Sequence, residues 1–490
     1  MTEAQLYERR RWIALGLLCM AQFVVVLDAA IVNVALPSIG DALSFSQDNL
    51  SWVVNAYVLT FGGFLLLGGR LADLLGRRRV FMFGLVLFAL ASLAGGFATS
   101  EGWLIGARAV QGLGAAILSP AALSIVTTTF RDGAERNKAL GAWGAVAGSG
   151  GAAGVLLGGV LTEYLGWEWV LWVNVPIGIA AAIVAPMLIA ESRSESMTRS
   201  FDLAGAISVT AGLSVLVYAL VDATDAGWGS TQTIVLLAVA VALMAAFVAI
   251  ERRSDAPLVP FSIFRLRTLT GANVVGILTG ASLFSMFFFI SLYMQQVLGY
   301  SAIKAGLSYL PLALTIILTA AVASQLVTRV GFKPVLATGM ALIAAGLVWF
   351  GQVSVGGGFA TDVLGPSLLA AAGLGLAFVP QTIAAVSGVG ESEAGLASGL
   401  ITTSQQIGGA LGLAVLATIA NTRTDDVLAS AGGDPSALPN ALTEGFQSAF
   451  LGGAGIAVLG LVATLVLIRN RDSRAHVELG ASTEPATQRP

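Results

Sequence analysis

Two residues of opposite charge interrupt long apolar segments near the start of the chain. Asp28 lies deep within the apolar segment 12–37, and Arg108 lies near the beginning of the segment 103–129. If the two segments are helices that cross a membrane in opposite directions, a rise of about 1.5 Å per residue can place both side chains at the same depth. Charged groups are costly in hydrocarbon and tend to pair or to face a cavity. Two interpretations are open: a static ion pair that joins two helices, or a carboxylate that takes up and releases a proton as its surroundings change.

A second group of charges lies between the apolar segments 49–69 and 80–100. It reads Gly69-Arg-Leu-Ala-Asp-Leu-Leu-Gly-Arg-Arg-Arg79, so that Asp73 stands between two glycines and is followed by three arginines. A basic loop by itself is typical of the cytoplasmic side of a membrane protein. An acid placed between two helix ends, next to this basic cluster, is less ordinary.

The elements that must position these groups are membrane helices. A helix needs roughly 20 mainly apolar residues to cross a bilayer, and charges interrupt this chain at about that interval. The predicted spans are 12–37, 49–69, 80–100, 103–129, 139–162, 168–190, 202–222, 231–250, 268–297, 304–328, 334–354, 362–387, 395–420 and 446–468. The sequence therefore predicts an all-α polytopic membrane protein with fourteen transmembrane helices.

The composition supports this class. Of the 490 residues, 56% are hydrophobic and 11% are charged, against about 25% charged in average soluble domains. A soluble enzyme, a nucleic-acid-binding protein and a disordered scaffold are excluded as descriptions of the whole chain. A single cysteine, Cys19, excludes an intramolecular disulfide. The single histidine, His476, falls in a polar tail at 471–490, which we expect to be disordered, with the histidine solvated.

Lysine and arginine placement predicts the orientation. With both termini on one side of the membrane, that side carries every lysine and arginine except Lys304, Arg423 and the intramembrane Arg108. Because basic residues concentrate in cytoplasmic loops, we expect both termini to be cytoplasmic.

An internal repeat divides the chain. Residues 135–154 align with residues 393–412, and Glu135, Gly141 and Gly150 find identical partners in the second segment. Span five therefore repeats as span thirteen, which predicts two homologous six-helix halves, as in many secondary transporters. The predicted units are an N-terminal half at 1–190, an inserted helix pair at 191–253, a C-terminal half at 254–470 and the tail. Counting along the repeat places Met286 where the first half has Asp28.

The segment from Gly69 to Arg79 closely resembles the signature of the major facilitator superfamily. The resemblance implies a cytoplasmic gate formed by Gly69, Asp73, Gly76, Arg77 and Arg78, in which the acid pairs across the gap between the two halves. The family pattern favours a basic residue where this chain has Leu74. The second half has Thr328 in place of Asp73, so only the first half keeps the charged gate.

Further motifs resemble those of the fourteen-helix drug:proton antiporters within this family. Span one contains Leu27-Asp-Ala-Ala-Ile-Val-Asn-Val-Ala-Leu-Pro37, with Ala30 where the family usually has threonine. Span four contains Arg108-Ala-Val-Gln-Gly-Leu-Gly-Ala-Ala116, and Gly166-Trp-Glu-Trp with Asn174-Val-Pro-Ile-Gly178 follows. Span five ends in Gly154-Val-Leu-Leu-Gly-Gly159, in which Val155 replaces the usual proline.

The polar residues within the spans suggest a cavity lining. Amide, hydroxyl and aromatic side chains without a second acid would form an amphipathic pocket, although each one is more often a contact between helices. The candidates are Gln22, Asn33, Asn55, Tyr57, Trp143, Asn273, Tyr293, Gln296, Gln381 and Gln405.

Together these features predict a transporter and not an enzyme. We expect it to export amphipathic drugs or antibiotics across the plasma membrane, in a bacterium, with Asp28 and Arg108 coupling export to proton entry. The expected partners are the substrate, protons and the bilayer, with no cofactor and no nucleic acid, and the expected state is a monomer. The alternatives are a proton-coupled symporter or uniporter for a small organic nutrient, which Val155 leaves open, and a membrane receptor or lipid-handling scaffold.

Overall fold

The computed structural model describes residues 3–45, 50, 52–130, 133–192, 202–254, 257–390, 393–432 and 434–483. Over these residues the chain is helical and contains no strand. Fourteen of its helical segments are long and apolar enough to cross a membrane. The predicted fold class and the predicted number of spans are therefore confirmed.

The helices fall into three groups along the chain. The first group comprises α1 (Glu3–Leu43), α3 (Trp52–Leu75), α4 (Arg77–Gly96), α5 (Glu101–Thr129), α6 (Ala134–Tyr164), α7 (Trp169–Trp172) and α8 (Asn174–Leu188). The inserted pair is α9 (Leu203–Ala226) and α10 (Thr231–Glu251). After a short 3-10 turn, η1 (Phe261–Arg265), the last group comprises α11 (Arg267–Leu292), η2 (Tyr293–Val297), α12 (Ala302–Ser308), α13 (Leu310–Val330), α14 (Phe332–Phe350), η3 (Phe359–Val363), α15 (Leu364–Val386), α16 (Ala394–Ser430), η5 (Pro435–Ala437), α17 (Leu438–Leu467) and α18 (Asn470–Thr483).

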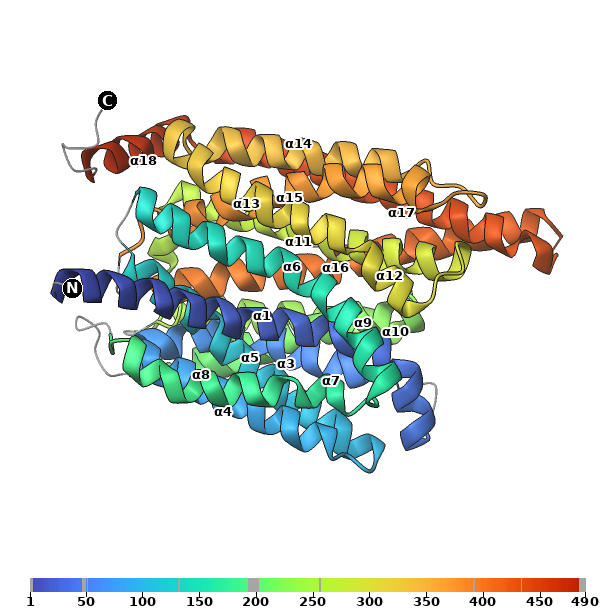
Figure 1. The fold of residues 1–490 in the computed structure, drawn as a ribbon, viewed down its shortest axis with the longest axis horizontal. Coiled ribbons are helices and arrows are strands. Elements are labelled where there is room, and N and C mark those ends of the chain that lie inside the picture. Colours follow the sequence, from blue (N-terminus) through green and yellow to red (C-terminus); the bar gives the residue numbers. More distant parts are fainter. Residues whose placement is uncertain are drawn as a thin grey trace.

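The same packing scheme occurs in both halves. In the first, α3 and α4 pack on α5 and α1 packs on α6; in the second, α13 and α14 pack on α15 and α11 packs on α16. Figure 1 shows the two halves side by side, with the start of α1 and the helix α18 at the same end of the bundle. We call this end the terminal face and the other end the opposite face.

Glycines permit the closest of these crossings. A Cβ on Gly84 of α4 or on Gly114 of α5 would collide with the backbone of the other helix. Gly339 of α14 and Gly373 of α15 are related in the same way. Small residues let helix backbones approach closely in a membrane, so the repeated glycines mark equivalent crossings in the two halves.

The halves contact each other through two pairs of helices, each pair with one helix from either half. Helix α3 of the first half packs on α16 of the second, and α13 of the second half packs on α6 of the first. Because α16 repeats α6 and α13 repeats α3, the two contacts are equivalent.

Two sequence-based expectations need correction. The tail expected to be disordered forms the helix α18 from Asn470 to Thr483, and its last seven residues, 484–490, lie outside the described residues. His476, expected to be solvated, is only 7% exposed. The reason is that α18 packs against α13 and α14 at the terminal face.

The segment 421–445, which separates the predicted spans 395–420 and 446–468, is also largely helical. Helix α16 continues to Ser430 and α17 begins at Leu438. An ion pair of 2.6 Å between Arg423 and Glu444 joins the two helical extensions, which project from the opposite face in Figure 1. The segment therefore extends two spans beyond the bundle.

The inserted pair lies at the edge of the bundle. Helix α9 packs on α3 and α16, so it covers the seam between the halves, and α10 packs mainly on α9. The Trp52 and Tyr218 rings stack at 5.6 Å, and the Trp228 indole donates to the Thr418 hydroxyl at 2.7 Å. Most of the polar segment 191–202, at the start of the predicted insert, lies outside the described residues.

This placement predicts that the pair does not contribute to a central aqueous path. In a Cys19→Ala background, cysteines at Ser208 and Tyr218 of α9 should resist a membrane-impermeant maleimide in sealed vesicles. A cysteine at Thr231, which is exposed at the start of α10, is the matched control and should react from the opposite face. Rapid labelling at Ser208 would contradict the peripheral placement.

Candidate functional site

The predicted pair of intramembrane charges forms a direct contact. The Arg108 guanidinium of α5 donates through Nη1 to Oδ2 of Asp28 on α1 at 2.6 Å. Both side chains are almost completely buried, Asp28 at 0% and Arg108 at 1% exposure. Asp28 and Arg108 therefore lie at the same depth in their two helices, as the sequence predicted.

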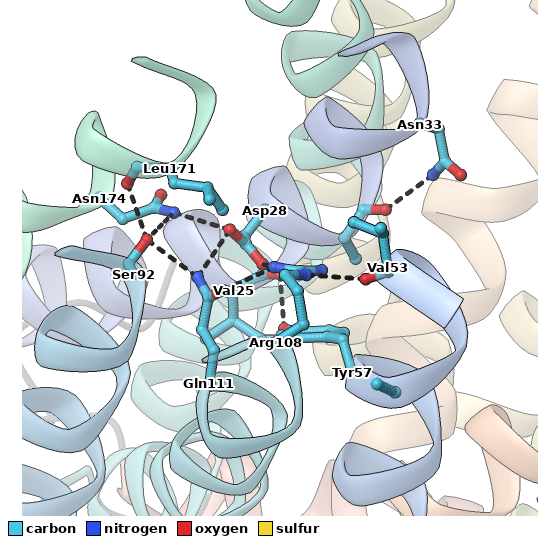
Figure 2. Close-up of polar contacts among 12 residues, drawn as sticks. Val25, Asp28, Asn33, Val53, Tyr57, Ser92, Arg108, Gln111, Leu171 and Asn174 are labelled. Atoms are coloured by element: carbon cyan, nitrogen blue, oxygen red, sulfur yellow. Dashed lines mark hydrogen bonds and ion pairs between the residues drawn. The ribbon is translucent and has the colours of Figure 1, made fainter. Parts of the chain in front are cut away.

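Every polar atom of this carboxylate has a partner. Asp28 Oδ1 accepts from the side-chain amides of Gln111 at 2.8 Å and Asn174 at 2.7 Å. The Ser92 hydroxyl accepts from both amides at 3.0 Å and donates to the Leu171 carbonyl at 2.7 Å. Figure 2 shows these side chains converging on Asp28 from different helices. Buried carboxyl groups need such hydrogen bonds, and the two amides supply them.

Arg108 is held equally firmly. Its Nε donates to the Val53 carbonyl of α3 at 3.0 Å, and its Nη1 also donates to Gln111 Oε1 at 2.6 Å. The guanidinium lies over the Tyr57 ring, 4.3 Å from the centroid, in a favourable cation–π arrangement. The network thus joins α1, α3, α4, α5, α7 and α8, all of the first half.

The predicted gate joins the two halves. Asp73, at the end of α3, accepts hydrogen bonds at 3.0 Å from the backbone N–H groups of Gly395 and Leu396, in the first turn of α16. Arg77 donates to the same carboxylate at 2.9 Å. A carboxylate at a helix N-terminus is stabilised by the unpaired N–H groups and the helix dipole. Gly69 packs so closely on Gly395 that a Cβ on either would collide with the other backbone.

The other gate residues bind within the first half. Gly76 has φ +105°, a conformation that favours glycine, and separates α3 from α4. The Glu191 carboxylate accepts from the backbone N–H groups of Arg78 and Arg79 at 3.1 and 3.2 Å. Nε of Arg78 also lies 3.7 Å from Oε2 of Glu191. Two charged groups of this motif therefore bind the second half: Asp73 accepts from the first turn of α16, and Arg70 donates to the Pro257 carbonyl at 2.9 Å.

The candidate cavity residues of the first half have separate environments. Tyr57 belongs to the Arg108 site, and Gln22 accepts from Ser119 of α5 at 2.8 Å. Asn33 is exposed and donates to Ala29 of its own helix at 2.9 Å, apart from the carboxylate network in Figure 2. Asn55 is partly exposed on α3 and Trp143 is buried on α6.

In the second half, the candidates include one polar side chain without a partner. Gln381 of α15 is fully buried, and neither its amide oxygen nor its nitrogen has a hydrogen-bond partner among the described residues. Asn273 accepts from Ser404 at 2.9 Å. Gln405 is partly buried, and Gln296 is exposed in η2.

The structure does not support a cavity role for Tyr293. Its hydroxyl lies 2.7 Å from the Ser354 carbonyl and 3.0 Å from the Asp362 carboxylate. Its side chain is fully buried. These contacts fix the end of α11 to the turn before η3 at the opposite face, so the hydroxyl is already engaged there.

Some site residues were missed by sequence reasoning. Gln111 lies three residues after Arg108, on the same helix face, and Asn174 lies in a quoted motif, so both had a signal. Ser92 lies in an apolar span with no motif, and nothing local indicates its role.

Comparison with known proteins agrees with this architecture. The family model described as Major Facilitator Superfamily matches residues 18–413. A solved structure of the proton:xylose symporter XylE, 12% identical, has a TM-score of 0.66 over 94% of this chain and 96% of that chain. Two halves of membrane helices that contact each other through equivalent helix pairs agree with the class of membrane transporters, and the chain belongs to the major facilitator superfamily.

Relatives within the family match nearly the full length. The cephamycin export protein CmcT of Amycolatopsis lactamdurans is 43% identical over 93% of this chain and 92% of its own length. The puromycin resistance protein pur8 of Streptomyces alboniger is 38% identical over 98% of this chain and 96% of its own length.

Proposed function

We propose that this protein exports an antibiotic or another amphipathic organic molecule across the plasma membrane of a bacterium, in exchange for protons. The relatives named for antibiotic export and resistance match it over nearly their full length, which supports the substrate class. The observation that carries the mechanism is the buried Asp28–Arg108 pair, because it supplies one carboxylate whose charge state can control helix packing.

Proton uptake would act through that network. Protonation removes the charge of Asp28, so its attraction to Arg108 and its ability to accept two amide hydrogen bonds both weaken. The guanidinium would keep the Val53 carbonyl, Gln111 and the Tyr57 ring as partners. The contact between α1 and α5 would thereby loosen, while the Arg108 guanidinium would keep these other partners.

The gate supports an alternating-access cycle in which the terminal face is cytoplasmic. Asp73 and Gly395 join the halves at that face, so the state described here is closed on the terminal side. The distribution of lysine and arginine supports a cytoplasmic terminal face. Release of Asp73 from the first turn of α16 would let the halves separate there and admit substrate.

Substrate recognition would fall to residues of the interior that have free polar capacity. Gln381 can donate and accept, and both capacities are unused in this state. Its surroundings include Gly276 and Ile401, so it would provide an isolated amide in apolar surroundings, which suits an amphipathic molecule with a hydrogen-bonding group.

Transport in proteoliposomes tests the proposal. The purified full-length chain is reconstituted and loaded with puromycin, a cephamycin or ethidium, and a pH gradient is imposed. We expect proton influx to drive efflux of at least one probe, with collapse of the rate when a protonophore removes the gradient. Gradient-driven accumulation in the same direction as the protons would indicate a symporter, and equal rates with and without the gradient would indicate a uniporter.

A further inference from the structure

The only histidine of the chain lies at the junction of the two halves. His476 of α18 is 3.1 Å, through Nε2, from Oδ1 of Asn137 at the start of α6. Asn137 donates through Nδ2 to the Thr328 hydroxyl of α13 at 2.9 Å. Asn137 is fully buried and His476 is 7% exposed. A side chain of the first half is thus held by one side chain of the second half and one of α18.

The neighbouring hydrogen bonds fix the direction of this contact. The Thr328 hydroxyl donates its one proton to the Ser324 carbonyl at 2.9 Å, so its oxygen must accept from Asn137. The amide nitrogen of Asn137 therefore faces Thr328 and its oxygen faces His476. His476 must then donate from Nε2, which both the neutral Nε2–H tautomer and the imidazolium can do.

The contact is the counterpart of the charged gate. Asp73 ends α3 and binds the first turn of α16; Thr328 ends α13 and binds Asn137 in the first turn of α6. The sequence has no acid at this second position. A group of Thr328, Asn137 and His476 takes its place, and the third member comes from outside the repeat.

Helix α18 is attached to the second half by several contacts. The Ser473 hydroxyl accepts from the Lys333 backbone at 3.1 Å, and Asp472 accepts from the Thr268 hydroxyl. The Phe332 and His476 rings meet edge to face at 5.8 Å. Because α18 is attached to the second half, its bond to Asn137 joins the halves.

We propose that α18 is a latch that holds the terminal face closed, and that the hydrogen bond from His476 to Asn137 is its contact across the halves. The latch must release before the terminal face opens. Its loss favours the open state even when the charged gate of Asp73 is intact. The proposal rests on the proposed alternation between two states, but it concerns their relative population and not the transported molecule.

A distance measurement tests the latch without substrate or gradient. Spin labels are placed on the full-length Cys19→Ala chain at Arg9 of α1 and Arg329 of α13, both exposed near the terminal face, and the protein is studied in lipid nanodiscs. His476→Ala should raise the ratio of long to short distances about three- to ten-fold, as expected for one buried hydrogen bond. A chain that ends at Arg469 should show at least the same shift.

Two further variants separate the latch from general destabilisation. His476→Gln can still donate to Asn137 and should keep the wild-type distribution, and so should Arg474→Ala on the exposed side of α18. A wild-type distribution in both His476→Ala and the truncated chain overturns the proposal, and so does a shift in His476→Gln equal to that of His476→Ala. The experiment measures distances and no transport. Its result can therefore be interpreted even if the export proposal fails.

Discussion

Replacing Asp28 by asparagine should abolish pH-driven efflux, with rates equal to those of protein-free liposomes. The amide is close in size to the carboxylate but binds no proton in the working range, so the cycle loses its coupling step. Arg108 would remain buried without its counter-charge, and loss of one partner of a buried pair lowers the free energy of unfolding by about 3–5 kcal/mol. Efflux from proteoliposomes under an imposed gradient and thermal unfolding in detergent measure the two effects.

Two controls identify the cause of the loss. Substrate counterflow without a pH gradient should persist in Asp28→Asn, because it requires binding and exchange of access but no proton. Asp222→Asn is the matched carboxylate control, since Asp222 lies at the end of a span in the inserted pair and accepts from Gln232 at 2.9 Å. Full gradient-dependent efflux by Asp28→Asn would falsify the coupling role and leave a purely structural ion pair.

The second large effect is expected at the gate. Asp73→Asn removes the charge that accepts from Arg77 and from the first turn of α16. Hydrogen bonds to a charged group contribute about 1.5–3 kcal/mol, so the closed terminal face should lose about 10- to 100-fold in population relative to the open one. The initial transport rate should fall by about ten-fold as the cycle stalls in the open state, without unfolding.

Glu191→Gln is the matched control for this prediction. Glu191 also caps a helix N-terminus, that of α4, but its hydrogen bonds stay within the first half. The Glu191→Gln substitution should lower the thermal stability slightly and leave the distance between labels at Arg9 and Arg329 unchanged. If Asp73→Asn transports at the wild-type rate and keeps the wild-type distance, the motif is a topology signal only.

Local sequence properties determined the spans and the repeat. A membrane helix is specified by an unbroken apolar length, so fourteen spans could be counted without any tertiary information. The glycines repeated in spans five and thirteen identified two halves, because a repeat can also be recognised along the chain without any tertiary information. The pairing of Asp28 with Arg108 could be predicted because they were the charges placed deep in the spans, at compatible depths.

Tertiary structure alone decided how these groups are completed. Ser92 and Asn174 reach Asp28 from other helices, and no spacing along the chain encodes a contact formed when separate helices pack. Helix α18 has no long apolar run and depends on docking for its stability, so the sequence predicted a disordered tail. The bond between His476 and Asn137 joins residues 339 positions apart, and only the packing of both halves at one face brings them together.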